Sequence, residues 1–94
     1  MHRAFFICAN QAAEVIGVGS TSVHRWACRQ VTPYNFPLRV VKHGGHNFIA
    51  EADVRIAEQV QREFPMPHGR LTSARREQMK RYAEILRAAM TPRA

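Results

Sequence analysis

The sequence predicts a mainly α-helical fold with a small β-hairpin, followed by a C-terminal amphipathic helix. Two observations indicate this class. Apolar residues recur at helical spacing in short segments that glycines and prolines separate. Two segments rich in β-branched and aromatic residues flank the pair Gly44-Gly45, a pattern typical of a tight hairpin turn. The 94 residues are enough for one small domain, and no stretch approaches the about 20 apolar residues that a membrane-spanning helix needs.

The first expected helix covers residues 10–16. Asn10 is a suitable N-cap, because its side-chain oxygen can accept a hydrogen bond from a first-turn N–H. Gly17 can take the left-handed conformation that ends a helix. The apolar residues of this helix share one face, which consists of Ala12, Val15 and Ile16.

A second helix is expected over residues 20–30, with Ser20 as its N-cap. One side of this helix should pack on the first helix, and it consists of Val23, Trp26, Ala27 and Gln30. The opposite side is polar and cationic, and it consists of Thr21, Arg25 and Cys28, flanked by His24 and Arg29. We expect Trp26 to belong to the core, because it follows Val23 at a spacing of one helical turn.

The middle of the chain predicts the hairpin and a third helix. Residues 38–42 and 47–49 are the expected strands, and Gly44 and Gly45 can both adopt the positive φ of a type I′ turn. The helix is expected over residues 51–64, with acidic residues in its first turn, where the helix dipole favours anions. Its apolar stripe consists of Val54, Ala57, Val60 and Phe64.

A proline-rich hinge over residues 65–71 is expected to separate a domain of residues 1–64 from a basic amphipathic segment of residues 72–94. The helix expected over residues 72–90 has an apolar face made of Met79, Tyr82, Ala83, Leu86, Ala89 and Met90. Such a wide apolar face must be buried, so we expect a second copy to bind it, with oligomerisation residues Met79, Tyr82, Leu86 and Met90. Two alternatives remain open, a basic arm along a phosphate backbone and a helix folded back on its own domain.

The charge of the chain favours a polyanionic partner. Lys and Arg number 14 against 7 Asp and Glu, which gives a net charge of +7. The surplus is concentrated in residues 64–94, where Arg70, Arg75, Arg76, Lys80, Arg81, Arg87 and Arg93 face only Glu77 and Glu84. No arrangement typical of a catalytic site is present, and the His and Cys spacing matches no zinc motif. We therefore expect no enzyme activity, no metal and no other cofactor, and free thiols at Cys8 and Cys28.

Two short helices joined by a glycine-containing turn form a helix-turn-helix unit, and a hairpin that follows them is a wing. The second helix of such a unit enters the major groove of double-stranded DNA, where small hydrogen-bonding and cationic side chains can reach base edges. The polar side of the helix at residues 20–30 has this character, and the paired glycines allow the wing backbone to approach phosphates. The expected DNA-binding residues are Ser20, Thr21, Ser22, His24 and Arg25 near the bases, Arg29, Arg39 and Lys42 at phosphates, and His43, Gly44, Gly45, His46 and Asn47 in the wing.

Several stretches carry a resemblance to a known family, namely residues 11–18 (QAAEVIGV), 20–26 (STSVHRW), 36–41 (FPLRVV) and 48–54 (FIAEADV), together with the Gly44-Gly45 turn. In their order and spacing, residues 9–60 resemble the winged helix-turn-helix of the MerR superfamily, most closely its AlpA-like phage regulators and excisionases. The resemblance implies DNA contacts at the positions of Thr21, Ser22, Arg25 and the wing. The connector at residues 31–35 is longer than is usual in that family and lacks its common glycine.

These features predict a sequence-specific double-stranded DNA-binding protein of a phage or other mobile element, located in the cytoplasm of a bacterial host at its nucleoid. It would act as a transcription regulator or as an excisionase-like architectural factor. The expected partners are DNA, further copies of the chain in a dimer or an array on DNA, and a recombinase or RNA polymerase; no membrane is expected. Two alternatives stay open, the small subunit of a phage packaging terminase and a protein–protein adaptor that uses the C-terminal helix.

Overall fold

The computed structural model describes residues 5–65 and 71–90. Within these ranges it contains four helices and one three-stranded antiparallel sheet with the strand order β1-β3-β2. The elements in chain order are β1 (Phe6–Cys8), α1 (Ala9–Ile16), α2 (Ser20–Arg29), β2 (Val40–His43), β3 (His46–Ala50), α3 (Glu51–Glu63) and α4 (Ser73–Met90). The predicted class, mainly α with a small β-hairpin, is confirmed at this level. Most of the predicted hinge at residues 65–71 and the end of the C-terminal segment lie outside the described residues.

Helix α1 begins one residue earlier than predicted, and the capping role of Asn10 is wrong. The N-cap position is Cys8, and Asn10 lies inside the helix, where its Oδ1 accepts a hydrogen bond of 2.9 Å from His24 Nε2. Val15 is 40% exposed, because the buried face is formed instead by Ala9, Ala12, Ala13 and Ile16. Gly17 ends the helix as predicted, with a φ of +86° and its N–H bonded to the Ala13 carbonyl.

Helix α2 follows after the short turn at residues 17–19. Gly19 occupies the N-cap position, so the prediction that Ser20 caps this helix is wrong. The helix ends at Arg29, because Gln30 adopts a left-handed φ of +59° and leaves the helical path. Gln30 is consequently exposed rather than part of the packed side, whereas Val23 and Ala27 are buried there as predicted.

The hairpin turn is confirmed, since Gly44 and Gly45 have φ values of +59° and +81°. Strand β2 starts two residues later than expected, because the backbone N–H groups of Leu38 and Arg39 bond to Gln30 O and Asp53 Oδ2 instead of a neighbouring strand. Strand β1 was not predicted, and it pairs with β3 from Phe6 opposite Ala50 to Cys8 opposite Phe48.

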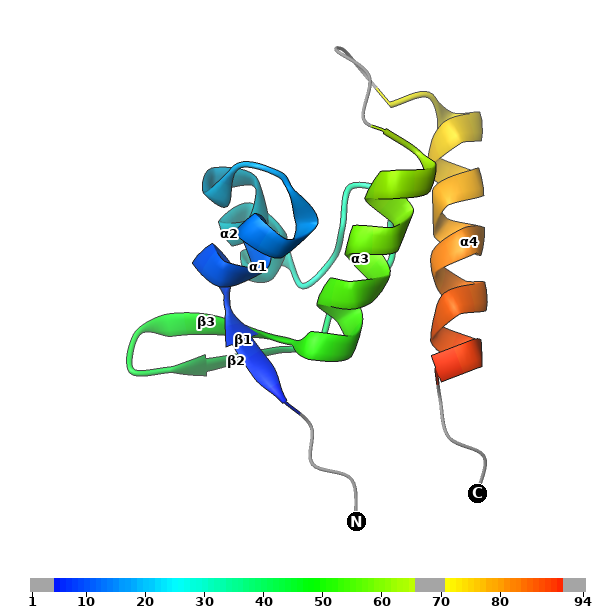
Figure 1. The fold of residues 1–94 in the computed structure, drawn as a ribbon. Coiled ribbons are helices and arrows are strands. Elements are labelled where there is room, and N and C mark those ends of the chain that lie inside the picture. The colour runs from blue at the N-terminus through cyan, green and yellow to red at the C-terminus, as the bar shows by residue number, and fades with distance from the viewer. Residues whose placement is uncertain (1–4, 66–70, 91–94) are drawn as a thin grey trace.

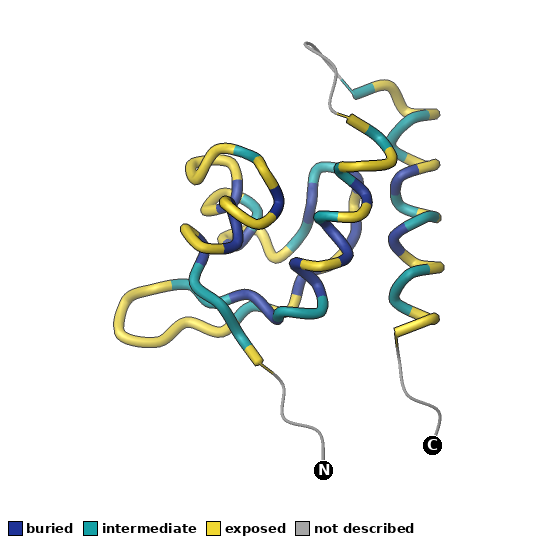
Figure 2. Tube along the Cα trace, viewed as in Figure 1, coloured by how far each residue is buried: buried dark blue, intermediate teal, exposed yellow. Residues whose placement is uncertain are grey.

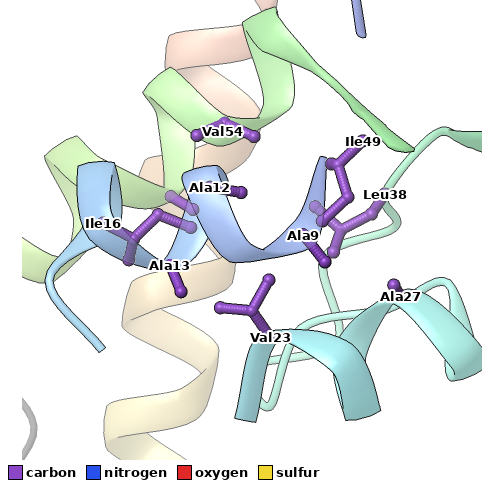
Figure 3. Close-up of a cluster of buried hydrophobic side chains, with 10 residues drawn as sticks. Ala9, Ala12, Ala13, Ile16, Val23, Ala27, Leu38, Ile49 and Val54 are labelled. Atoms are coloured by element: carbon purple, nitrogen blue, oxygen red, sulfur yellow. The ribbon is translucent and has the colours of Figure 1, made fainter. Parts of the chain in front are cut away.

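The first hydrophobic core lies among α1, α2, α3 and the sheet. Figure 3 shows α1 between the two other helices, with Val23 of α2 on one side and Val54 of α3 on the other. Small residues on α1 allow this close approach. Trp26 of α2, which was expected in the core, is only partly buried and packs against the cluster. The buried members are Ala9, Ala12, Ala13, Ile16, Val23, Ala27, Leu38, Ile49, Val54 and Ala57.

A second hydrophobic core joins α3 to α4. Tyr34 and Phe36 of the connector between α2 and β2 meet Ile56 and Val60 of α3 and the inner side of α4, which contributes Met79 and Ala83. The edges of this core are covered by Phe64, Leu71, Tyr82 and Leu86. Figure 2 shows the buried residues of α4 on the side that faces α3. Residues 73–90 are thus packed on the domain that precedes them.

The predicted oligomerisation surface requires a correction. Met79 is 1% exposed, and Tyr82 and Leu86 are partly covered by the chain's own second core. The apolar side of α4 is therefore occupied within the chain, in the folded-back arrangement that was one of the alternatives. Of the four expected residues, Met90 alone is exposed, at 45%.

A buried carboxylate holds α4, α3 and the connector together. Asp53 of α3 is fully buried, and its Oδ1 accepts hydrogen bonds from Arg87 Nη2 at 2.6 Å and from Arg39 Nη2 at 3.2 Å. Arg87 also donates to the Pro37 carbonyl at 3.0 Å and lies over the ring of Phe36, 4.1 Å from its centroid. Charged hydrogen bonds of this kind are stronger than neutral ones, so this network fixes the position of α4.

Candidate nucleic-acid interface

The outer side of α2 is polar, cationic and exposed. Packing of Val23 and Ala27 on α1 leaves the opposite side of the helix in solvent. All of the α2 residues selected from the sequence are exposed, namely Ser20, Thr21, Ser22, His24, Arg25 and Arg29. The hydrogen bond between His24 and Asn10 orients the imidazole toward α1, so His24 also links the two helices. This side of α2 can donate hydrogen bonds and present positive charge to a flat or convex partner.

The hairpin presents different residues on its two faces. Lys42 and Asn47 are paired across the strands and therefore point to the same face. The Asn47 amide lies 4.0 Å from Cys28 Sγ of α2, which shows that this face is directed toward α2. His43 and His46 are paired at the next position and point to the opposite face, together with Val41. Lys42 is thus the hairpin side chain that extends the cationic surface of α2.

The tip of the hairpin is open to close approach. Residues 41–46 are all exposed, and Figure 2 shows the tip in solvent. A Cβ atom added at Gly44 or Gly45 would meet nothing within 4 Å, so the backbone there is free on its outer side. An extended polyanion could therefore contact the main chain of the turn directly.

The charged side chains of α2, the connector and the hairpin are all cationic. No acidic residue occurs between Glu14 and Glu51, a segment that contains α2, the connector, the hairpin and all their cationic residues. In the described part of the chain, Arg25, Arg29 and Lys42 form no ion pair with a carboxylate, because the ion pairs there involve α3 and α4. Figure 1 shows α2 and the hairpin on one side of α3, with α4 on the other. We call the exposed side of α2 together with Lys42 and the Gly44-Gly45 turn the basic face.

Arg39 does not belong to this basic face in the way that the sequence suggested. Its side chain is 61% exposed, but its Nε and Nη2 donate to the two oxygens of Asp53 at 3.2 Å each. The hydrogen bonds and the charge of Asp53 raise the pKa of the Arg39 guanidinium. Arg39 was predicted to hold a phosphate; in the structure its guanidinium binds Asp53, a carboxylate that it shares with Arg87.

Sequence reasoning missed two residues that position side chains selected from the sequence. Asn10 positions His24, and Asp53 positions Arg39 just before β2. A signal for Asp53 was present, because Asp53, Ile56 and Val60 follow one another at helical spacing and form a second buried stripe on α3. The partners of Asp53 lie 14 and 34 residues away, and no local pattern identifies them.

Two further features of the described residues concern metal ions and membranes. No group of three or more His, Cys, Asp or Glu side chains there could hold a metal ion. None of the helices in the described ranges has the length and apolar character to span a membrane. Searches for similar proteins returned no matching family model, no matching curated protein and no matching solved structure.

Proposed function

We propose that this chain is a sequence-specific double-stranded DNA-binding protein of a phage or other mobile element, acting as a transcription regulator or an excisionase-like architectural factor. The observation that carries the proposal is the basic face, in which unpaired cations and hydrogen-bonding side chains of α2 lie beside an open hairpin turn. Such a concentration of positive charge on one side of a small domain is typical of nucleic-acid-binding proteins.

In this proposal, α1 and α2 form a helix-turn-helix, and α2 enters the major groove. The groove admits a helix whose exposed side chains reach base edges. Thr21 and Ser22 lie in the first turns of α2, where small side chains permit close contact, and Arg25 follows one turn later. Arg25 would donate a pair of hydrogen bonds to guanine, while Arg29 would hold a phosphate at the groove edge.

The hairpin would act as a wing on the neighbouring phosphate backbone. Lys42 points toward the side of α2 and would contact a phosphate, and the open turn at Gly44-Gly45 would let the main chain approach the sugar-phosphate strand. The contact between Asn47 and Cys28 joins the hairpin to α2, so the two elements would bind as one unit.

A DNA-binding role also implies the cytoplasm of a host cell as the location, and a recombinase or RNA polymerase as a further partner.

The test is selection of bound duplexes from a random DNA pool, followed by affinity measurements on the selected sequence. We expect an enriched sequence motif and an affinity that falls steeply with salt. Removing two charges from the basic face in Arg25→Ala/Lys42→Ala should weaken binding at least about tenfold. The matched control Arg55→Ala/Arg62→Ala removes two charges from exposed ion pairs on α3 and should change binding far less. Equal effects of the two double variants, or a pool without enrichment, would contradict the proposal.

A further inference from the structure

A groove of about 440 Å³ runs along α2, between this helix and the start of the connector to β2. Ser22, Trp26 and Arg29 follow one another at helical spacing and form one wall, and Arg25 contributes beside them. Val31 and Pro33 form the facing wall. The volume lies within the range of about 300–1,000 Å³ that is usual for small-molecule sites.

The lining of the groove combines apolar surface with positive charge. The half-buried indole of Trp26 and the aliphatic side chains of Val31 and Pro33 offer apolar contacts. Arg25 and Arg29 contribute two guanidinium groups, and among the described residues neither forms an ion pair. A phosphate backbone would use the arginines but gains nothing from the apolar wall. The combination fits a molecule with an apolar ring and one anionic group.

We propose that this groove binds a small aromatic carboxylate. The ring would lie against Trp26 and the connector, and the carboxylate would accept hydrogen bonds from Arg25 and Arg29. Guanidinium groups bind carboxylates through paired hydrogen bonds, which a neutral amide of the same shape cannot match. The negative charge should therefore make this ligand bind more tightly than neutral molecules of equal size.

Binding of such an anion would also regulate the basic face. Arg25 and Arg29 belong to both the groove and the basic face, so an occupied groove neutralises charges that DNA would otherwise contact. This regulatory part rests on the proposed DNA-binding function, whereas ligand binding itself does not.

The binding experiment uses 4-tert-butylbenzoate as the probe and 4-tert-butylbenzamide as its neutral counterpart. Trp26 is the single tryptophan of the chain, so its fluorescence reports directly on the groove, and calorimetry gives the affinity independently. We expect saturable binding of the benzoate at least about tenfold tighter than binding of the benzamide, since hydrogen bonds to charged groups are the stronger ones. Equal affinities, or no saturation of the fluorescence change, would overturn the site.

Three variants locate the bound probe. Arg29→Gln should weaken benzoate binding about tenfold and leave benzamide binding unchanged, because it removes one charged hydrogen-bond donor. Arg62→Gln, on the exposed side of α3, should change neither affinity. Ser22→Leu places a larger side chain at an exposed helical position and should fill the groove and abolish binding, with circular dichroism showing an intact helix content. Benzoate binding that survives both Arg29→Gln and Ser22→Leu would overturn the proposal.

A competition experiment separates the site from the proposed function. Saturating benzoate should weaken binding of the selected DNA at least about tenfold in the unmodified chain, as expected when one ligand excludes another. Benzamide at the same concentration should have no such effect. If the benzoate binds the groove and DNA affinity stays constant, the regulatory part is wrong. If the benzoate binds as expected but no DNA is bound, the proposed function fails while the site stands.

Discussion

The basic face and helix α4 carry similar cationic residues but place some of them in different surroundings. Arg25, Arg29 and Lys42 on the basic face form no ion pair with the described residues, and no acidic residue occurs along that part of the sequence. On α4, Arg87 binds the buried Asp53, and Arg81 pairs with Glu77. A surplus of positive charge in a segment therefore does not by itself identify a binding surface.

The difference teaches that the surroundings of a cationic residue matter more than the net charge of its segment. The sequence places most of the surplus beyond residue 63, which left a basic arm open as an alternative. In the structure, Arg75 lies over the ring of Phe64 at 5.1 Å, and Arg87 lies over Phe36 at 4.1 Å. These arginines contribute to the packing of α4 on the domain, as long cationic side chains often do.

The largest effect is expected for the variant Asp53→Ala. It leaves the guanidinium groups of Arg39 and Arg87 without their carboxylate, and breaking a buried ion pair costs about 3–5 kcal/mol of the free energy of unfolding. Urea unfolding followed by Trp26 fluorescence measures this loss. The control Glu77→Ala breaks an exposed pair with Arg81 and should cost less than about 1 kcal/mol. Equal losses for both variants would remove the distinction between the buried and the exposed ion pair.

The next largest loss of stability is expected for the variant Met79→Ala. Met79 is 1% exposed in the second core, and truncating such a side chain costs about 2–4 kcal/mol of the free energy of unfolding. The matched control Ile85→Ala lies on the outer side of α4, is 65% exposed, and should cost within about 0.5 kcal/mol. If Met79→Ala keeps its stability and instead lowers the mass seen by light scattering, α4 binds a second copy rather than its own domain.

The variant Arg25→Ala tests whether the basic face discriminates among DNA sequences. We expect a loss of about 1–3 kcal/mol in binding of the selected DNA, together with weaker discrimination among related sequences. Fluorescence anisotropy on the selected duplex and on single-base variants of it measures both quantities. A uniform loss for every duplex would assign Arg25 to phosphate contacts alone.

Lys42→Ala should give the smallest effect and a different signature. A lysine that contacts a phosphate contributes equally to all sequences, so its removal should weaken them alike and lower the slope of log affinity against log salt by about one. Anisotropy titrations at several salt concentrations give the slope. An unchanged slope would mean that Lys42 does not contact the DNA. The hairpin would then contact DNA only through its main chain.

Sequence reasoning predicted the features that local patterns determine. Helices α1, α2, α3 and α4 follow from helical spacing and from stop signals such as Gly17, and each predicted helix differs from the structure by one residue at one of its ends. The turn at Gly44-Gly45 follows from the conformational freedom of glycine. The exposed side of α2 follows from the burial of Val23 and Ala27 on its other side.

The missed features depend on distant partners. Strand β1 is short, and it is stabilised by pairing with β3 rather than by any local signal. Tyr34 and Phe36 lie in a connector without periodicity, so their contact with α4 was not predictable. In this connector, Asn35 takes a left-handed φ of +61°, a conformation that glycine otherwise supplies, and the Thr32 hydroxyl bonds the Phe36 backbone.

The arrangement of Phe36 beneath α4 limits how the gene can be shortened. A chain that stops at Phe64 would retain α1, α2 and the hairpin, yet it would leave Tyr34, Phe36 and Ile56 uncovered. Such a fragment would have an exposed apolar patch next to the segment that connects α2 to the hairpin. The exposed patch would make the fragment prone to aggregation. The C-terminal helix in this sense covers the domain, and only another helix of matching shape could replace it.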